Sequence, residues 1–80
     1  MIPAPSECRI LTALLLEPMD SSKLARVLDL TQDHVLRRLD YLMKCNEIHP
    51  QDHVTSLHGR PATRYGLTPR GYSWAVELIS

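Results

Sequence analysis

Five of the nine arginine and lysine side chains of this 80-residue chain lie in two short stretches. The first stretch holds Arg37, Arg38 and Lys44, and the second holds Arg60 and Arg64. Guanidinium and ammonium groups donate hydrogen bonds to anionic oxygens, and the arginine fork also fits the O6 and N7 edge of guanine. The two stretches therefore indicate a surface that binds anionic groups such as phosphates.

Other kinds of chemistry find little support in the residue types. The sequence lacks a nucleophile–base–acid spacing, a phosphate-binding glycine loop and a carboxylate pair, so we do not expect an enzyme. Cys8 and Cys45 lie far apart and, with the four histidines, match no zinc-ligand spacing. We therefore expect two reduced thiols, no metal and no other cofactor. A redox or metal sensor built from these side chains is one hypothesis for the function, and thiol titration with metal analysis of the purified protein tests it.

The net charge is zero, which argues against a simple polyanion binder. The charge is nevertheless unevenly distributed. Residues 1–33 carry three basic and five acidic groups, a balance of −2, whereas residues 34–70 carry six basic and three acidic groups, a balance of +3. The distribution, rather than the total, favours an anionic partner.

Capping residues and apolar periodicity predict the helices that must position these side chains. Residues 1–5 should be an extended arm, and residues 6–16 a helix so apolar that it packs in the core and is also shared with a partner subunit. Residues 22–28 should form a second helix, which Asp20 or Ser21 can cap. Thr31 then caps a third helix, residues 32–45, after a three-residue turn. Two helices joined by such a turn form a helix-turn-helix.

The third helix separates into an apolar and a polar side. At about 100° per residue, the apolar residues fall within one arc and the polar residues within the opposite one. Its position directly after the turn favours a binding role for the polar side over an ordinary solvated surface. The apolar arc holds Val35, Leu36, Leu39, Leu42 and Met43, and the polar arc holds Asp33, His34, Arg37, Arg38, Tyr41 and Lys44.

A β-hairpin and a fourth helix complete the predicted domain. Asn46 should end the third helix in a left-handed conformation, and Pro50 should lie at a sheet edge or a bend. Residues 53–57 and 63–67 read as two strands around a turn at 58–61, with a register that the sequence leaves open. Thr68 can cap a helix over residues 69–79. Its core stripe should be Tyr72, Ala75, Val76 and Ile79, with Trp74 and Leu78 to one side.

The order of these pieces resembles the winged helix-turn-helix transcriptional regulators of bacteria and archaea, broadly of the MarR and PadR kind. The resemblance covers most of residues 6–79. It rests on residues 21–28 and 31–44 for the two central helices, and on residues 44–48, 59–62 and 65–71 for the hairpin and final helix. The fold class it implies is α+β, mainly helical, with a three-helix core, a two-stranded wing and a C-terminal helix, forming one domain over residues 6–80.

The resemblance also implies which residues touch a partner. Helix 32–45 would enter the major groove of double-stranded DNA, and the wing, 53–67, would lie on the backbone or in the minor groove. Gly59-Arg60-Pro61 resembles the core of an AT-hook, in which arginine enters a narrow A·T minor groove. The residues expected at DNA are Thr31, Gln32, His34, Arg37, Arg38, Tyr41, Lys44, Arg60 and Arg64. Those expected between subunits of a homodimer are Leu11, Leu15, Trp74 and Leu78.

The leading hypothesis is thus a sequence-specific DNA-binding transcriptional regulator, acting as a homodimer in the cytoplasm and associated with the nucleoid. No apolar run is long enough to span a membrane, and no secretory signal is visible. The alternative is a protein–protein interaction module on the same fold, an adaptor or anti-repressor that does not touch DNA. Zero net charge and the apolar first helix favour that alternative.

Overall fold

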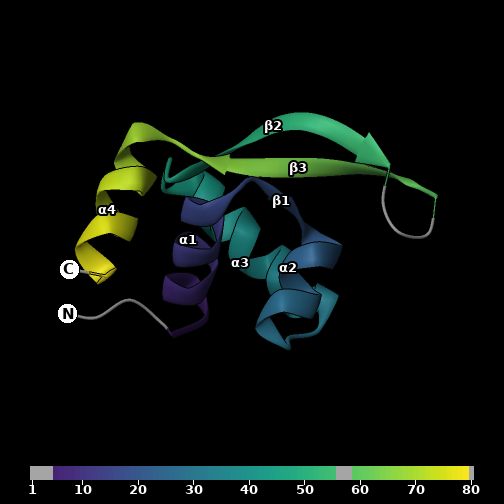
Figure 1. Cartoon of the computed structure of the whole chain (residues 1–80), viewed down its shortest axis with the longest axis horizontal. Coiled ribbons are helices and arrows are strands. Elements are labelled where there is room, and N and C mark those ends of the chain that lie inside the picture. Colours follow the sequence, from purple (N-terminus) through teal and green to yellow (C-terminus); the bar gives the residue numbers. More distant parts are fainter. Residues whose placement is uncertain (1–4, 56–58, 80) are drawn as a thin grey trace.

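Helices and a small antiparallel sheet make up the computed structural model, which describes residues 5–55 and 59–79. The sheet runs along one side of the helices, and the hairpin of its two long strands projects past α2 (Figure 1). None of the described helices is long and apolar enough to cross a membrane. In chain order the elements are α1 (Pro5–Leu16), β1 (Met19–Asp20), α2 (Ser21–Leu28), α3 (Gln32–Lys44), β2 (Ile48–Thr55), β3 (Pro61–Leu67) and α4 (Pro69–Ile79).

The predicted helix-turn-helix is present in α2 and α3. Asp20 and Thr31 each accept a hydrogen bond from the backbone N–H three residues later, at 2.7 and 3.2 Å, and so begin α2 and α3. Such caps satisfy amides that have no partner inside the helix. Asp29 ends α2 at φ 57°, the left-handed conformation that glycine often supplies at this point. Asn46 takes the same conformation after α3, as predicted, at φ 60°.

The sheet is larger than the sequence indicated. Its order is β1-β3-β2, and all pairings are antiparallel. The outer strand was predicted over residues 53–57, but its pairing with β3 already begins at Ile48, opposite Leu67. Pro50 fits into this strand because the strand lies at the edge of the sheet, next to an irregularity in the pairing register. The two-residue strand β1 was not predicted, since its pairing with β3 joins segments more than forty residues apart. Residues 1–4 of the predicted arm and residues 56–58 of the predicted wing lie outside the described residues, and Pro5, predicted in the arm, belongs to α1.

The core lies between α1, α2 and α3 and is closed by the sheet and α4. Leu11, predicted at a subunit interface, is 2% exposed and belongs to this core, so it has no surface to offer a second subunit. Leu15 and Leu78 also pack against the core, from partly buried positions. The buried apolar residues are Ile10, Leu11, Ala13, Leu14, Met19, Leu24, Leu28, Val35, Leu39, Leu42, Ile48 and Ala75.

The inward side of α4 differs from the predicted stripe. Of the four stripe residues only Ala75 is buried, whereas Tyr72 and Ile79 are 57% and 63% exposed. The helix is instead turned so that Gly71 and Ala75 are buried. A β-carbon built on Gly71 would lie 1.8 Å from the carbonyl oxygen of Glu47. This close approach of two backbones sets the rotation of α4, which periodicity alone could not give.

Candidate nucleic-acid interface

An open groove of about 630 Å³ lies between the hairpin and the N-terminal ends of α2 and α3. Gln32, the first residue of α3, donates a hydrogen bond from Nε2 to the hydroxyl of Ser21 at 3.1 Å, which joins the two helices at the groove. Both residues are the first of their helices, so helix N-termini line this side of the groove. The lining residues are Ser21, Ser22, Gln32, Leu36, Arg60, Pro61, Ala62, Thr63 and Tyr65.

Leu36 lies at this groove and not in the core where the sequence placed it. Its side chain is 45% exposed, while Val35, the residue before it, is fully buried. The two differ by about 100° around the helix, so Leu36 lies at the margin of the apolar arc. The hairpin passes at a distance from this margin and leaves the groove open. Gln32, one turn earlier, lies on the same side.

The outer side of α3 is close to electrically neutral. Arg37 pairs with Asp33 at 3.2 Å, and Lys44 pairs with Asp40 at 3.0 Å, each within one turn of the helix. The predicted polar arc omitted Asp40, which made this side look more basic than it is. Exposed pairs of this kind contribute only about 0–1 kcal/mol, so both cations can exchange their carboxylates for phosphates.

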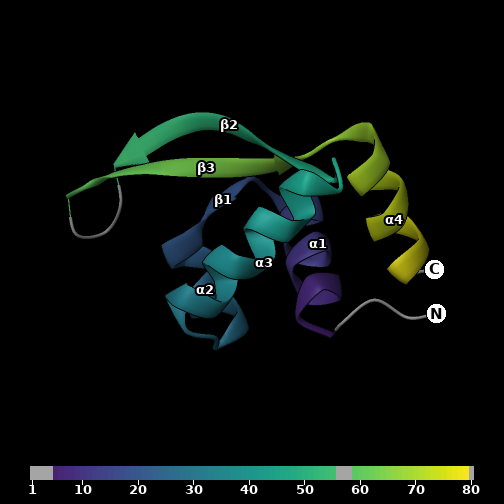
Figure 2. The ribbon, with the colours of Figure 1, turned by 180° about the vertical axis from the view of Figure 1, so that it is seen from behind.

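The remaining predicted residues of α3 are His34, Arg38 and Tyr41, and Arg38 reaches α1, which lies behind α3 in Figure 2. Arg38 Nη1 is 3.4 Å from the Glu7 carboxylate of α1, and Glu7 is 8% exposed. The Nε2 atom of His34 is buried, with no hydrogen-bond partner among the residues described. A hydrogen bond with Cys45 raises the pKa of Tyr41 above its ordinary value. These three residues therefore belong to a different side of α3 from Gln32.

The guanidinium of Arg64 is held on the hairpin itself. Its Nε donates to Asp52 Oδ1 at 2.7 Å and its Nη2 to the other carboxylate oxygen, so the pair is bidentate. The pairing register places these residues opposite each other on β2 and β3. Because the sequence did not determine this register, it predicted Arg64 at DNA without its carboxylate partner. Of the predicted wing residues, Arg60 rather than Arg64 lines the groove.

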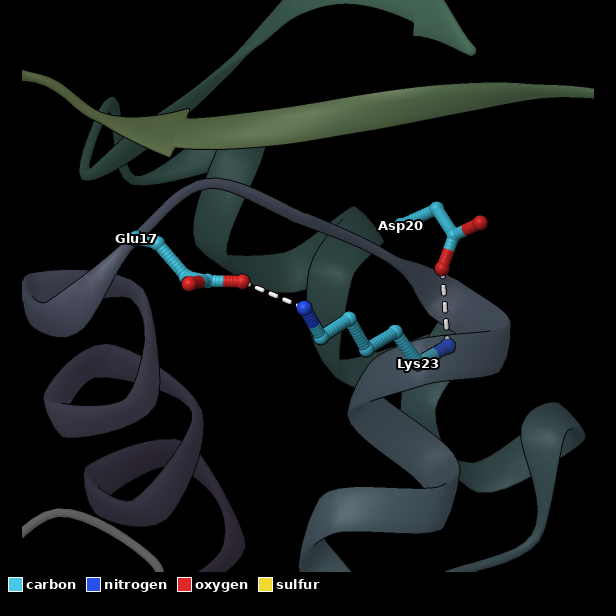
Figure 3. Close-up of polar contacts among 3 residues, drawn as sticks. All are labelled: Glu17, Asp20 and Lys23. Atoms are coloured by element: carbon cyan, nitrogen blue, oxygen red, sulfur yellow. Dashed lines mark hydrogen bonds and ion pairs between the residues drawn. The ribbon is translucent and has the colours of Figure 1, made fainter. Parts of the chain in front are cut away.

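A second hollow, of about 300 Å³, includes Arg64 and the segment before α2. Figure 3 shows two carboxylates around Lys23: its ammonium pairs with Glu17, and its backbone N–H donates to Asp20. The Lys23 ammonium holds the pKa of Glu17 below its ordinary value. Because both carboxylates are engaged with Lys23, they fix the start of α2. The pair of Lys23 with Glu17 was not predicted from the sequence.

The Asp52–Arg64 pair predicts a specific titration. The Arg64 guanidinium holds the pKa of Asp52 below its ordinary 3.8, so the ionised carboxylate favours the folded hairpin at pH values above this point. That contribution is lost as the pH falls through the lowered pKa. We expect NMR titration of the Asp52 carboxyl to give a midpoint below 3.8 in the native protein. In Arg64→Gln the midpoint should return to the ordinary value, and an unchanged midpoint would contradict the pair.

Metal ligands do not gather in the part of the chain that the structure describes: no three His, Cys, Asp or Glu side chains there lie close enough to hold an ion. Cys8 and Cys45 are thiols and not a disulfide. His58 lies outside the described residues. Neither the thiols nor the described histidines form part of the groove.

Solved structures of transcription regulators share this fold. The adhesin competence repressor AdcR from Streptococcus pyogenes aligns over 95% of this chain and 55% of its own, with a TM-score of 0.83 and 20% identity. A mutant form of ZitR from Lactococcus lactis aligns over 99% and 52%, with a TM-score of 0.80 and 18% identity. A MarR-family transcription regulator aligns over 96% and 50%, with a TM-score of 0.81 and 20% identity.

The chain spans about half the length of these solved structures. No family model and no curated protein matches its sequence. The alignments extend over 95–99% of this chain. The chain therefore has the winged helix-turn-helix fold found in MarR-family transcription regulators.

Proposed function

We propose that this protein is a sequence-specific DNA-binding transcriptional regulator. In this proposal α3 enters the major groove and the hairpin of β2 and β3 lies on the backbone or in the minor groove. The observation that carries the proposal is the open groove that Gln32, Leu36 and Arg60 line together. These residues come from both parts of a winged helix that the family uses on DNA, and they supply donors for phosphate or base edges.

The names of the structural neighbours support the same role. They are a repressor and transcription regulators, and their alignments cover 95% and 96% of this chain. Fold alone does not establish function, so the proposal also rests on the groove. The pairing of Arg38 with Glu7 and of Arg64 with Asp52 leaves few cations for phosphate, and we therefore expect modest affinity for each subunit.

A salt titration tests DNA binding directly. Anisotropy measurements on duplexes selected from random DNA should show saturable binding at low salt, and the slope of log K against log salt concentration should reflect only a few phosphate contacts. Arg60→Ala and Arg37→Ala should each reduce the magnitude of this slope by about 0.9 and weaken binding to all sequences. Arg70→Ala, at the exposed start of α4, removes the same charge outside both hollows and is the matched control.

The control should leave the slope unchanged, which separates a local contact from a change in total charge. If the folded protein binds no selected or genomic duplex at low salt, the proposal is wrong. Circular dichroism of each variant, at the temperature of the titration, establishes that a loss of binding is not a loss of fold.

The proposal includes a homodimer on a palindromic site, with half-sites about one helical turn apart. Apolar side chains remain on the outside of α4, where Tyr72, Trp74 and Ile79 are each at least 37% exposed. An exposed apolar surface of this kind is typical of protein interfaces. Trp74 therefore stays a proposed interface residue, and sedimentation of the free protein and its DNA complex measures the stoichiometry. The site of action would be the cytoplasm, at nucleoid DNA.

The same exposed surface of α4, with the zero net charge, supports the second candidate function. This candidate is a protein–protein interaction module, an adaptor or anti-repressor that does not contact DNA. Under it, Arg37→Ala and Arg60→Ala should leave the cellular activity intact, and Trp74→Ala should abolish it. The DNA-binding proposal expects the arginine variants to lose activity.

A further inference from the structure

We propose that Leu36 recognises the methyl group of a thymine and that, with Gln32, it selects A·T base pairs in each half-site. This inference rests on the proposed function and assigns it a specificity-determining pair. Neither residue is charged, so the pair would contribute to the choice of sequence more than to the attraction to phosphate.

The position of Leu36 is the first observation behind this inference. The Leu36 side chain is 45% exposed, whereas Val35 and Leu39 on the buried side of the same helix are 0% and 1% exposed. It lies beside the groove, where a bound duplex would cover it, and this would remove apolar surface from water. In the major groove, the thymine methyl is the apolar group that a base pair presents to a protein. Leu36 and that methyl group are therefore complementary.

Gln32 supplies the second half of the pair. It lies one turn before Leu36, so both side chains point to the same side of α3. A glutamine amide can bind the N7 and N6 atoms of adenine with two hydrogen bonds. Its present bond to the Ser21 hydroxyl is exposed, so it can be exchanged for bonds to a base. One turn of α3 thus presents a side chain that can bind adenine, Gln32, and one that can contact the thymine methyl group, Leu36.

The charged residues of α3 are less suited to this task. Arg37 is paired with Asp33 at 3.2 Å, and Arg38 is turned toward Glu7 on α1. Each would have to leave a carboxylate before it could make a bidentate contact with guanine. Gln32 gives up only one exposed hydrogen bond to Ser21, and Leu36 is an apolar side chain with no polar partner to lose. Discrimination by the N-terminal half of α3 therefore falls to Leu36 and Gln32.

Thymine-to-uracil replacement in a selected duplex tests the inference, because uracil keeps the base pair and lacks only the methyl group. At one thymine of a single half-site, this replacement should weaken binding of the native protein about four-fold, the effect of losing the burial of one methyl-sized group. Leu36→Ala should bind the thymine duplex more weakly and should not distinguish thymine from uracil there. Val27→Ala, which removes an apolar side chain that is 54% exposed on α2 outside the groove, should distinguish them as the native protein does.

The outcomes separate this inference from the proposed function. If the native protein binds duplexes selectively but is indifferent to uracil at every thymine, Leu36 does not read a methyl group, and DNA binding still stands. Retained discrimination in Leu36→Ala would overturn the role of Leu36 in the same way. If no duplex binds at all, both proposals fall. Thermal unfolding of each variant establishes that the binding comparisons use folded protein.

Discussion

Gly71→Ala should destabilise the protein by about 3 kcal/mol, at the upper end of the cost of overpacking a core. The added methyl group would lie 1.8 Å from the carbonyl oxygen of Glu47 and 2.8 Å from its carbonyl carbon. Both are backbone atoms, so no side-chain rotation can relieve the overlap. Either α4 or the segment after α3 must move, although alanine would otherwise favour a helix. Urea denaturation followed by circular dichroism measures the loss.

The surroundings of Gly71 explain why neither segment moves cheaply. The Thr68 hydroxyl donates to the Asn46 carbonyl at 2.7 Å and accepts from the Gly71 amide at 3.1 Å. The Thr68 amide donates to the Glu47 carbonyl at 3.1 Å. The start of α4 is thus bonded to the end of α3 through one residue. A shift of α4 that makes room for a methyl group would stretch the two bonds from Thr68 to Asn46 and Glu47.

Ser73→Ala, on the exposed side of the same helix, is the control for this prediction. Its free energy of unfolding should stay within about 0.5 kcal/mol of the native value. If Gly71→Ala unfolds at the same urea concentration as Ser73→Ala, the contact with Glu47 does not determine how α4 packs. The prediction would then be contradicted, and with it the explanation for the rotation of α4.

Leu39→Ala should cost about 2–5 kcal/mol, because it leaves a cavity in the core behind α3. Leu39 is 1% exposed and lies among buried side chains of α1 and α2. The free energy of unfolding of a domain of this size is only about 5–10 kcal/mol, so a large fraction of the stability would be lost. The measurement is again urea denaturation, and the slope of the transition should be unchanged.

Leu36→Ala on the same helix is the matched comparison for Leu39→Ala. It removes the same atoms from a side chain that is 45% exposed, so its cost should be about 1 kcal/mol or less. The stability difference between the two variants places Leu36 outside the core without any reference to DNA. Equal losses would contradict the exposure of Leu36 and return it to the apolar arc that the sequence predicted.

Much of the fold follows from short-range chemistry that is visible in the sequence. Asp20, Thr31 and Thr68 cap helices because their side-chain oxygens reach a backbone N–H within the same turn. Asn46 ends α3 because its side chain tolerates the left-handed region. These features depend on a few neighbouring residues. Capping and apolar periodicity therefore predicted the order and approximate bounds of the four helices.

Contacts between distant segments decided which side chains are available at the groove. Leu36 is exposed, Arg38 pairs with Glu7, and Arg64 pairs with Asp52. Each of these outcomes depends on how α1, α3 and the two strands pack against one another. Periodicity could not give the rotation of α4 either, because a backbone contact between Gly71 and Glu47 sets it. A helical repeat describes one element, whereas register and rotation depend on the shape of its neighbours. The sequence alone thus determined the elements and their order, and the tertiary structure decided which of their side chains can meet a partner.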